Sequence, residues 1–374
     1  MANIMDYLDW RGDLCLSRNI FNDVDALILA CLSYVDFSGI VPEISKGDIK
    51  LKDAAKIFFR MHSKQELESD KSFVAFAPQL LEKMSNTRRF SNLNLCNFVD
   101  IVDSRKVLQF SALEIKLNKD ISYISIRGTD DTLIGWREDF DIAYKQIPAQ
   151  KASVKYLEKI AESTGRKYFV GGHSKGGHLA MYCSSCVKKD LNNRILKVFS
   201  FDGPGFNEDF IDTKKIDEIS NRVVRIIPDT SVIGMLLINP IKAIVVKSSN
   251  YGLMQHDALS WEIMGKDFVT QENLSKTGQE IEKTFTTWIL NIAMEDRKAF
   301  IDDIWKVLDA TNETLLSHIY DGGLTTYKKM LEQLSNLDEN THAYVSDLLK
   351  LIKMQRRERL LDGMNRFFNN DKND

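Results

Sequence analysis

The sequence predicts an α/β fold with a mostly parallel central sheet, and three observations support this prediction. Short apolar runs that suit buried strands recur between residues 107 and 246. Amphipathic helical stretches separate several of these runs, and strands that alternate with helices favour a parallel sheet covered on both faces. A glycine-rich turn, Gly172-His173-Ser174-Lys175-Gly176, joins one such strand to the helix that follows it.

The length and the distribution of patterns predict two regions. The chain has 374 residues, more than a single hydrophobic core usually supports, so we expect one large domain and an accessory one. Helical periodicity dominates the N-terminal part, and no strand run appears after about residue 270. We therefore expect an α/β domain over residues 1–268, with a helical N-terminal segment, and a C-terminal helical accessory region over residues 269–374.

The strands are predicted from apolar runs bounded by turn residues. Val107 to Leu117 and Ile121 to Ile126 alternate apolar and polar residues around Asn118-Lys119-Asp120, which predicts a hairpin. A strand follows at residues 168–171, before the glycine-rich turn, and an amphipathic helix precedes it at residues 152–163. Further strands are expected at residues 196–201, 223–227 and 243–246, and further helices at residues 281–290, 297–308 and 325–334.

Composition and charge narrow the class of protein. The formal net charge of −3 gives no reason to expect a nucleic-acid partner. The opening ten residues contain two aspartates and no long apolar run, so we expect no signal peptide. The best membrane-spanning candidate, residues 231–246, is too short and is interrupted by polar residues. The five cysteines predict no disulfide framework and favour a reducing cytoplasm, and Cys183 and Cys186 are interpreted as core thiols.

The motif G-x-S-x-G at residues 172–176 lies between a predicted strand and a predicted helix, as a nucleophile elbow requires. In such an elbow a strained turn lifts the serine Oγ clear of the sheet. The flanking Gly172 and Gly176 would let neighbouring backbone pass without meeting a Cβ. A glycine-rich turn with an incidental serine is the alternative. The strand and helix on either side favour Ser174 as a nucleophile.

A serine hydroxyl needs a base to take its proton and a third group to orient that base. In α/β-hydrolases the chain order is serine, then Asp or Glu, then His. Of the six histidines, His256 alone follows the last predicted strand of the sheet in a loop, and we expect it to be the base. Asp229 ends the preceding strand and is the leading orienting acid. Asp202 also ends a strand and is its rival, whereas Asp257 is expected to be a surface or loop-fixing carboxylate.

The oxyanion of a tetrahedral intermediate needs preorganised hydrogen-bond donors. The backbone N–H of Lys175, which follows the nucleophile, is one expected donor. The second donor normally comes from the loop after an earlier strand, which here is Arg127-Gly128-Thr129. Arg127 and Asp139 are expected to form ordinary ion pairs.

These segments together resemble the class 3 (fungal-type) lipases. That family carries R-G-T or R-G-S at a strand end, a Trp and an Asp shortly after, then G-H-S-x-G-G, and finally an Asp and a His. The resemblance implies that Thr129 supplies an oxyanion donor through its backbone and hydroxyl, and that residues 131–140 correspond to the lid. The matching residues, in order, are Arg127-Gly128-Thr129, Trp136, Asp139, residues 172–177, Asp229 and His256.

The chain is also similar to a bacterial family of lipase-like α/β-hydrolases long known as a domain of unknown function. The similarity lies in the opening residues 1–14, in G-H-S-K-G-G, and in Q-H-D-A-L-S-W around His256. It covers most of the chain and implies an α/β-hydrolase fold. Lys175, which stands where lipases carry an apolar residue, and the expected absence of a secretion signal argue against triglyceride hydrolysis at an oil surface.

The sequence therefore predicts an intracellular serine hydrolase that cleaves a carboxylic ester of a lipid or small acyl compound without a cofactor or metal. Ser174 would attack the acyl carbon, His256 would relay the proton and Asp229 would hold His256, while Lys175 and Thr129 would stabilise the oxyanion. A thioesterase, a peptidase or a catalytically silent scaffold are the alternatives. Residues 350–359 are strongly basic; we expect a solvated helix face, with peripheral membrane contact as the alternative.

Overall fold

The computed structural model describes residues 1–70, 72–280, 282–283, 293–315, 318–319 and 323–334. Contacts divide the chain into two units, Met1–Asn291 with Thr314–Ser317, and Ile292–Glu313 with His318–Asp374. The expected division between residues 268 and 269 stays a prediction. The basic stretch at residues 350–359 and nearly all of the helix expected at residues 281–290 lie outside the described residues.

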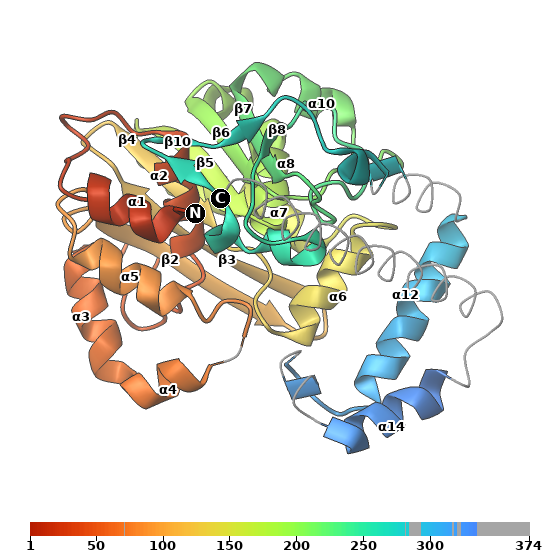
Figure 1. Cartoon of the computed structure of the whole chain (residues 1–374). Helices are drawn as coiled ribbons and strands as arrows, with labels where there is room; N and C mark the ends of the chain where they lie inside the picture. Colours follow the sequence, from red (N-terminus) through yellow and green to blue (C-terminus); the bar gives the residue numbers. More distant parts are fainter. Residues whose placement is uncertain (71, 281, 284–292, 316–317, 320–322, 335–374) are drawn as a thin grey trace, which may run out of the picture. The chain divides into compact units, whose positions relative to one another are not determined.

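The first unit is built around a sheet with the strand order β1-β2-β3-β4-β5-β6-β7-β8-β11 in the part of the chain that the structure describes (Figure 1). Strands β4 to β8 run parallel to one another, and the pairs outside them are antiparallel. The expected α/β class is thus confirmed at the centre of the sheet. The strands are β1 (Asp48–Lys50), β2 (Asn94–Asp103), β3 (Leu108–Lys116), β4 (Ile121–Ile126), β5 (Lys167–His173), β6 (Ile195–Phe201), β7 (Val223–Pro228), β8 (Ile244–Val246) and β11 (Thr270–Gln271).

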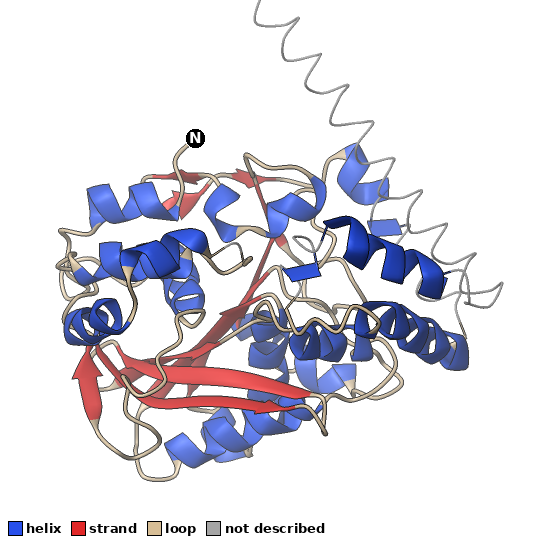
Figure 2. Ribbon diagram, turned by 90° about the horizontal axis from the view of Figure 1, so that it is seen from below, coloured by secondary structure: helices blue, strands red, loops and turns tan. Residues whose placement is uncertain are grey.

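Helices lie on both sides of the sheet, as Figure 2 shows, and the alternation of side chains along β4 explains why. Ile124 and Ile126 pack into the core under α7 (Pro148–Ala161) and α8 (Lys175–Cys186). The residues between them face α2 (Asp23–Leu32) instead: the hydroxyls of Tyr123 and Ser125 donate to backbone carbonyls of that helix. A strand covered on both faces is therefore buried almost throughout.

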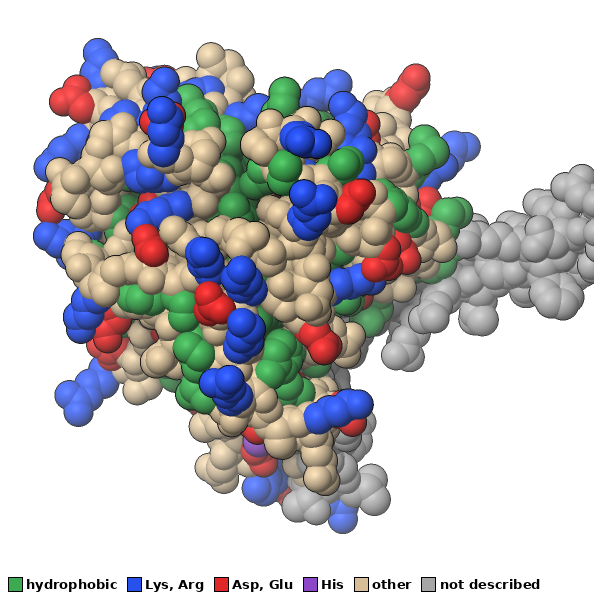
Figure 3. All heavy atoms as spheres, turned by 90° about the vertical axis from the view of Figure 1, so that its left-hand side faces the viewer, with side chains coloured by type: hydrophobic (Ala, Val, Ile, Leu, Met, Phe, Trp, Pro, Cys, Tyr) green, Lys and Arg blue, Asp and Glu red, His purple; other side chains and the backbone are tan. Residues whose placement is uncertain are grey.

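Every residue of helix α2 after Asp23 is buried, which is typical of a helix enclosed by other elements. Its first turn carries the fully buried Asp25, which forms an ion pair with the equally buried Arg89 and accepts a hydrogen bond from the Tyr7 hydroxyl. A buried charge needs such partners because desolvation would otherwise make it costly. This cluster ties the N-terminal helices together beneath a surface on which acidic and basic side chains are interspersed (Figure 3).

The remaining elements connect or flank this framework. Among the described residues, no helix is both long and apolar enough to cross a bilayer. In the second unit, Phe300 and Trp305 of α12 are buried. These elements are α1 (Ile4–Arg11), α3 (Leu51–Met61), α4 (Lys64–Ser69), α5 (Ala77–Ser85), α6 (Leu133–Asp141), α9 (Lys189–Asn192), α10 (Thr213–Asp217), η1 (Ser220–Arg222), η2 (Gly252–His256), η3 (Ala258–Ser260), β9 (Ile263–Met264), β10 (Asp267–Phe268), α12 (Met294–Asp309) and α14 (Gly323–Leu334).

The predicted hairpin is confirmed as the antiparallel pair β3 and β4, and the strands expected at residues 196–201, 223–227 and 243–246 are β6, β7 and β8. The short strands β1, β9 and β10 were not expected, and two longer elements also differ from expectation. Strand β2 lies where no strand was expected, because a register shift between Cys96 and Val99 interrupts its alternation. Residues 131–140, expected as a lid loop, contain most of helix α6.

Candidate active site

Ser174 lies between the end of β5 and the first residue of α8, in the turn that the motif predicts. Its φ of 59° and ψ of −133° are strained for a non-glycine residue and typically cost about 1–3 kcal/mol. A Cβ at Gly176 would lie 2.1 Å from the carbonyl oxygen of Ile126, and one at Gly172 would lie 2.4 Å from the same atom. The turn can therefore form only with glycine at both positions, which confirms the expected steric role of this pair.

The base expected from chain order, His256, lies at the end of η2 and meets a carboxylate. Its Nδ1 is 2.6 Å from Oδ2 of Asp202, which follows β6 and is fully buried. The other carboxylate oxygen of Asp202 accepts a hydrogen bond from the Ser231 hydroxyl. An ionised carboxylate only accepts, so Nδ1 of His256 carries the proton and Nε2 is left free to accept one.

Asp229 forms no hydrogen bond with His256, whose Nδ1 pairs with Asp202, and the expectation that Asp229 orients the base is wrong. Its Oδ1 accepts the backbone N–H of Ser275 at 2.5 Å. The physical reason is the direction of the loop after β8. That loop turns back across the sheet, so that the carbonyl of His256 reaches the ring of His173 at the end of β5. Strand β6 is the direct neighbour of β5, and Asp202 at its end is therefore the nearer acid.

His173 holds the loop that carries the base. Its Nε2 is 2.8 Å from the carbonyl oxygen of His256, and its Nδ1 is 2.9 Å from the hydroxyl of Tyr34. Burial lowers the pKa of His173 well below its usual value, so the ring is neutral. Because a carbonyl only accepts, Nε2 carries the proton and Nδ1 accepts the hydrogen bond from Tyr34. The N-terminal helical segment thus reaches the candidate site through this tyrosine.

His178, the other histidine of the motif region, is fully buried in the next turn of α8. Its Nδ1 donates to the carbonyl of Gly205 at 2.9 Å, and its Nε2 accepts from the amide of Gln150 at 2.8 Å. Burial lowers its pKa to about 4. Both ring nitrogens are occupied, so this histidine supports the loop after Asp202 and is not a base for the serine.

The loop after β4 approaches the nucleophile closely. A Cβ at Gly128 would lie 2.3 Å from the Tyr34 hydroxyl oxygen and 3.1 Å from Cβ of Ser174, so no larger residue fits there. Thr129 comes next, and its hydroxyl donates to Oδ2 of Asp139 on α6. The N–H of Lys175 is at the first position of α8, where an amide has no partner within the helix. The Thr129 hydroxyl is therefore occupied as a donor, which leaves the backbone N–H groups of Thr129 and Lys175 as the candidate oxyanion donors.

The side chain of Lys175 turns away from the surface and is 1% exposed. Its Nζ lies 2.9 Å from Oε1 of Gln109 and 3.1 Å from Oε2 of Glu138, a fully buried residue of α6. Oδ1 of Asp139 is 3.7 Å away. Glu138 was not predicted from the sequence, because a glutamate is rarely fully buried unless it is paired. The presence of lysine where an apolar residue was expected was the signal that could have found it.

Both residues that were expected to form ion pairs do so, Arg127 with two aspartates and Asp139 with Lys175, but only Asp139 belongs to the candidate site. Arg127 is almost fully buried and lies 2.9 Å from Asp100 and 3.3 Å from Asp130, which is the ordinary ion pair that was expected. Asp139 binds Thr129 and faces Lys175, so it belongs to the candidate site. Burial raises its pKa to about 6, although the nearby Lys175 ammonium opposes this shift.

Ser174 Oγ and His256 Nε2 are not hydrogen-bonded to one another in the structure. The base is nevertheless near the nucleophile, because the ring centroids of His256 and of His173, the residue before Ser174, lie 4.5 Å apart. Such bonds are often long in a free enzyme and form only when the substrate is bound. Asp257 does what was expected of it, since its carboxylate accepts the backbone N–H of Leu259 and fixes η3.

The cysteines of the chain are free thiols that differ in burial. All five cysteines are free thiols, and burial raises the pKa of Cys183 to about 12, which suits a core residue. Cys186, its partner in the C-x-x-C spacing, is partly buried at the same helix end. Within the described residues, no group of three or more His, Cys, Asp or Glu side chains is placed to hold a metal ion.

Comparison with known proteins places the chain in a family. The model of the Mbeg1-like family matches residues 84–306, more than half of the chain. Similar solved structures include M37 lipase, with 16% identity and a TM-score of 0.33 over 58% of this chain and 70% of that one. A fungal lipase–inhibitor complex, described as a model for interfacial activation, has 12% identity and a TM-score of 0.37 over 66% of this chain and 81% of that one. The Rhizomucor miehei lipase–propeptide complex is another, with 13% identity and a TM-score of 0.35 over 55% of this chain and 67% of that one. A search of curated proteins gives no match. The chain belongs to the Mbeg1-like family, a lipase-like family, as its motifs predict.

Proposed function

We propose that this chain is a serine hydrolase that cleaves carboxylic esters through Ser174, His256 and Asp202. The contact between His256 and Asp202, beside a serine on a strained strand-to-helix turn, is the observation that carries this proposal. A structural histidine would use both ring nitrogens, as His178 does. His256 keeps Nε2 available, and that is what a general base requires.

In the proposed reaction, Nε2 of His256 takes the proton of Ser174 while Oγ attacks the acyl carbon of the ester. The oxyanion that forms is stabilised by the backbone N–H groups of Lys175 and Thr129. Asp202 holds the imidazole in the productive tautomer and stabilises the imidazolium. The C–O bond of the ester then breaks, and His256 gives its proton to the departing alcohol. Water releases the acyl group from Ser174 by the same steps, with His256 again as the base.

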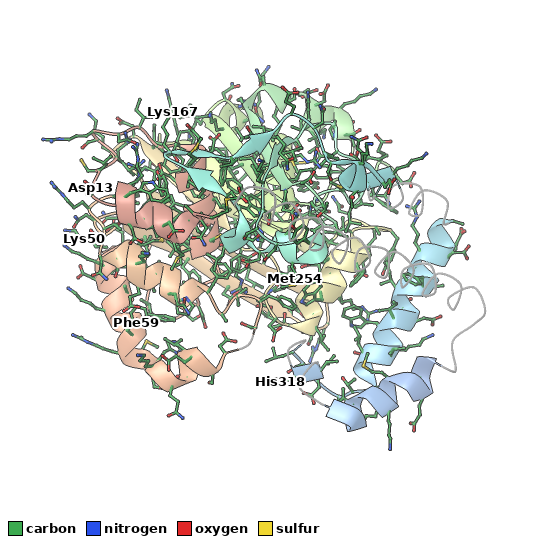
Figure 4. All side chains as sticks on the ribbon, in the orientation of Figure 1. Asp13, Lys50, Phe59, Lys167, Met254 and His318 are labelled. Atoms are coloured by element: carbon green, nitrogen blue, oxygen red, sulfur yellow. The ribbon has the colours of Figure 1, made fainter. Side chains whose placement is uncertain are left out.

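The substrate we propose is an ester of a lipid or small acyl compound. Met254 lies on η2, two residues before His256, with 59% of its surface exposed (Figure 4). An exposed thioether beside the base suits contact with an acyl chain. We further propose that the protein works in the cytoplasm, because its five cysteines are all free thiols, two of them fully buried.

The proposal is tested by a series of p-nitrophenyl esters from acetyl to palmitoyl, with matched acyl thioesters, on purified protein. We expect saturable ester hydrolysis that falls to background in the Ser174→Ala variant. Faster turnover of the thioesters would assign the same site to a thioesterase. Equal rates for the wild type and Ser174→Ala on every substrate would contradict hydrolase activity and favour a silent scaffold.

A further inference from the structure

We propose that Lys175 and Glu138 are positioning residues for the oxyanion hole. Their buried ion pair connects the helix that begins at the nucleophile to α6, and α6 holds the hydroxyl of Thr129 through Asp139. The inference rests on the proposed hydrolase function and adds a mechanism of control at the same site. Lys175 would then serve both oxyanion donors. Its own N–H is one donor, and its ammonium group supports Thr129, which supplies the other.

The ammonium group of Lys175 is buried. An ammonium enclosed by protein must find acceptors, because water no longer solvates it. Lys175 finds the amide oxygen of Gln109 at 2.9 Å and the carboxylate of Glu138 at 3.1 Å. Gln109 lies on β3 and Glu138 on α6. The lysine therefore links three elements at the edge of the candidate site.

Glu138 has anchoring contacts besides the lysine. Its Oε2 accepts the backbone N–H of Gln109 at 3.1 Å, and its Oε1 accepts that of Ala149, at the start of α7, at 2.9 Å. The carboxylate is thus fixed by two main-chain donors as well as by the ammonium. Such a side chain is a fixed anchor for α6, since moving the helix would break all three contacts.

Helix α6 also contacts Thr129. Asp139 follows Glu138 on α6 and accepts the hydrogen bond of the Thr129 hydroxyl. The helix also packs closely on the same residue, since a Cβ at Gly135 would lie 2.9 Å from Cγ2 of Thr129. Any displacement of α6 would therefore displace the support of Thr129. The geometry favours a fixed α6 that preorganises the oxyanion hole, where the lipase resemblance implies a lid.

A double-mutant cycle tests the proposal. Lys175→Met and Glu138→Gln keep similar side-chain volume, and each alone leaves one buried charge without its partner. The double variant removes both charges, which often restores stability at a buried ion pair. We expect both single variants to have lowered Tm and kcat. In the double variant we expect Tm to return toward the wild-type value, while kcat stays on the order of tenfold or more below wild type with KM little changed.

A wild-type kcat in the double variant, or in both single variants, would overturn the proposal, because the pair would then serve stability alone. Failure of the proposed function gives a different pattern. In that case the wild type itself shows no Ser174-dependent ester turnover, and the inference falls with it. An active wild type whose kcat is unaffected by the double substitution overturns only the positioning role.

The pH profile gives a second test that a purely structural role would not pass. The groups that face Asp139 are Lys175, Thr129, Glu138, His256 and Tyr34. Removing the Lys175 cation takes away a contribution that lowers the pKa of Asp139, so the part of the acid limb of kcat that follows the ionisation of Asp139, as distinct from that of His256, should move to higher pH. Removing the Glu138 anion should move it to lower pH. In an Asp139→Asn background neither substitution should move the limb; a shift that persists there contradicts the assignment.

Discussion

Oδ2 of Asp202 lies 2.6 Å from Nδ1 of His256, whereas the carboxylate of Asp229 binds the backbone N–H of Ser275. Two aspartates that both follow parallel strands therefore have different roles. Asp202 is fully buried and fixed by Ser231, as an acid that orients an imidazole should be. Asp229 instead joins the end of β7 to the segment that follows β11.

This difference predicts unequal losses in two matched variants. Asp202→Asn should favour the wrong tautomer of His256 and lower kcat by about a thousandfold or more. Asp229→Asn should keep kcat within a few-fold of wild type. It should lower the free energy of unfolding by about 1 kcal/mol, because the hydrogen bond to Ser275 is weakened. Ester turnover and thermal melting of both proteins decide the matter. Comparable kcat values for the two variants would contradict the assignment of Asp202.

The role of His173 predicts a loss that acts through His256. His173→Phe removes the donor to the carbonyl of His256, so we expect kcat to fall by about tenfold or more as the base loses its position. Tyr34→Phe should have a smaller effect of the same kind. Tyr7→Phe is the control, because its buried hydroxyl binds Asp25 in the N-terminal cluster. If the control lowers kcat as much as His173→Phe at equal Tm, the positioning role is not supported.

The close contact at Gly176 predicts a large cost for a single methyl group. Gly176→Ala would place Cβ 2.1 Å from the carbonyl oxygen of Ile126, and we expect a loss of about 3 kcal/mol or more in the free energy of unfolding. Gly165→Ala is the matched control, since a Cβ there meets nothing within 4 Å. It should be neutral or slightly stabilising. Urea unfolding measures both, and equal stabilities would refute the steric account of the turn.

A fixed α6 predicts how the rate depends on the state of the substrate. Where a mobile lid covers a site, activity rises sharply once the substrate forms an interface. Here Glu138 and Lys175 hold α6 in place, so we expect the rate to follow one hyperbola through the solubility limit of a medium-chain ester. Turnover measured on both sides of that limit tests this. A jump at the limit, absent in a soluble short-chain ester, would show that α6 or another element opens.

Much of the fold follows from the sequence because the hairpin and the central strands bury alternating or continuous apolar residues. Helix α6 was missed for a physical reason: its inward face carries Glu138 and Asp141 in place of an apolar stripe. In the site, Ser174 and His256 could be predicted from the motif and chain order. The choice between Asp202 and Asp229 could not, since it depends on the direction of the loop after β8, which tertiary contacts decide.

The central claim, that Ser174 is a nucleophile activated by His256, is tested most directly by covalent labelling with a fluorophosphonate, read by mass spectrometry of the labelled peptide. We expect one adduct per chain, on Ser174, in the wild type. Labelling should be strongly slowed in His256→Ala and absent in Ser174→Ala. An unlabelled wild type, or an adduct on another residue that persists in Ser174→Ala, would contradict the account.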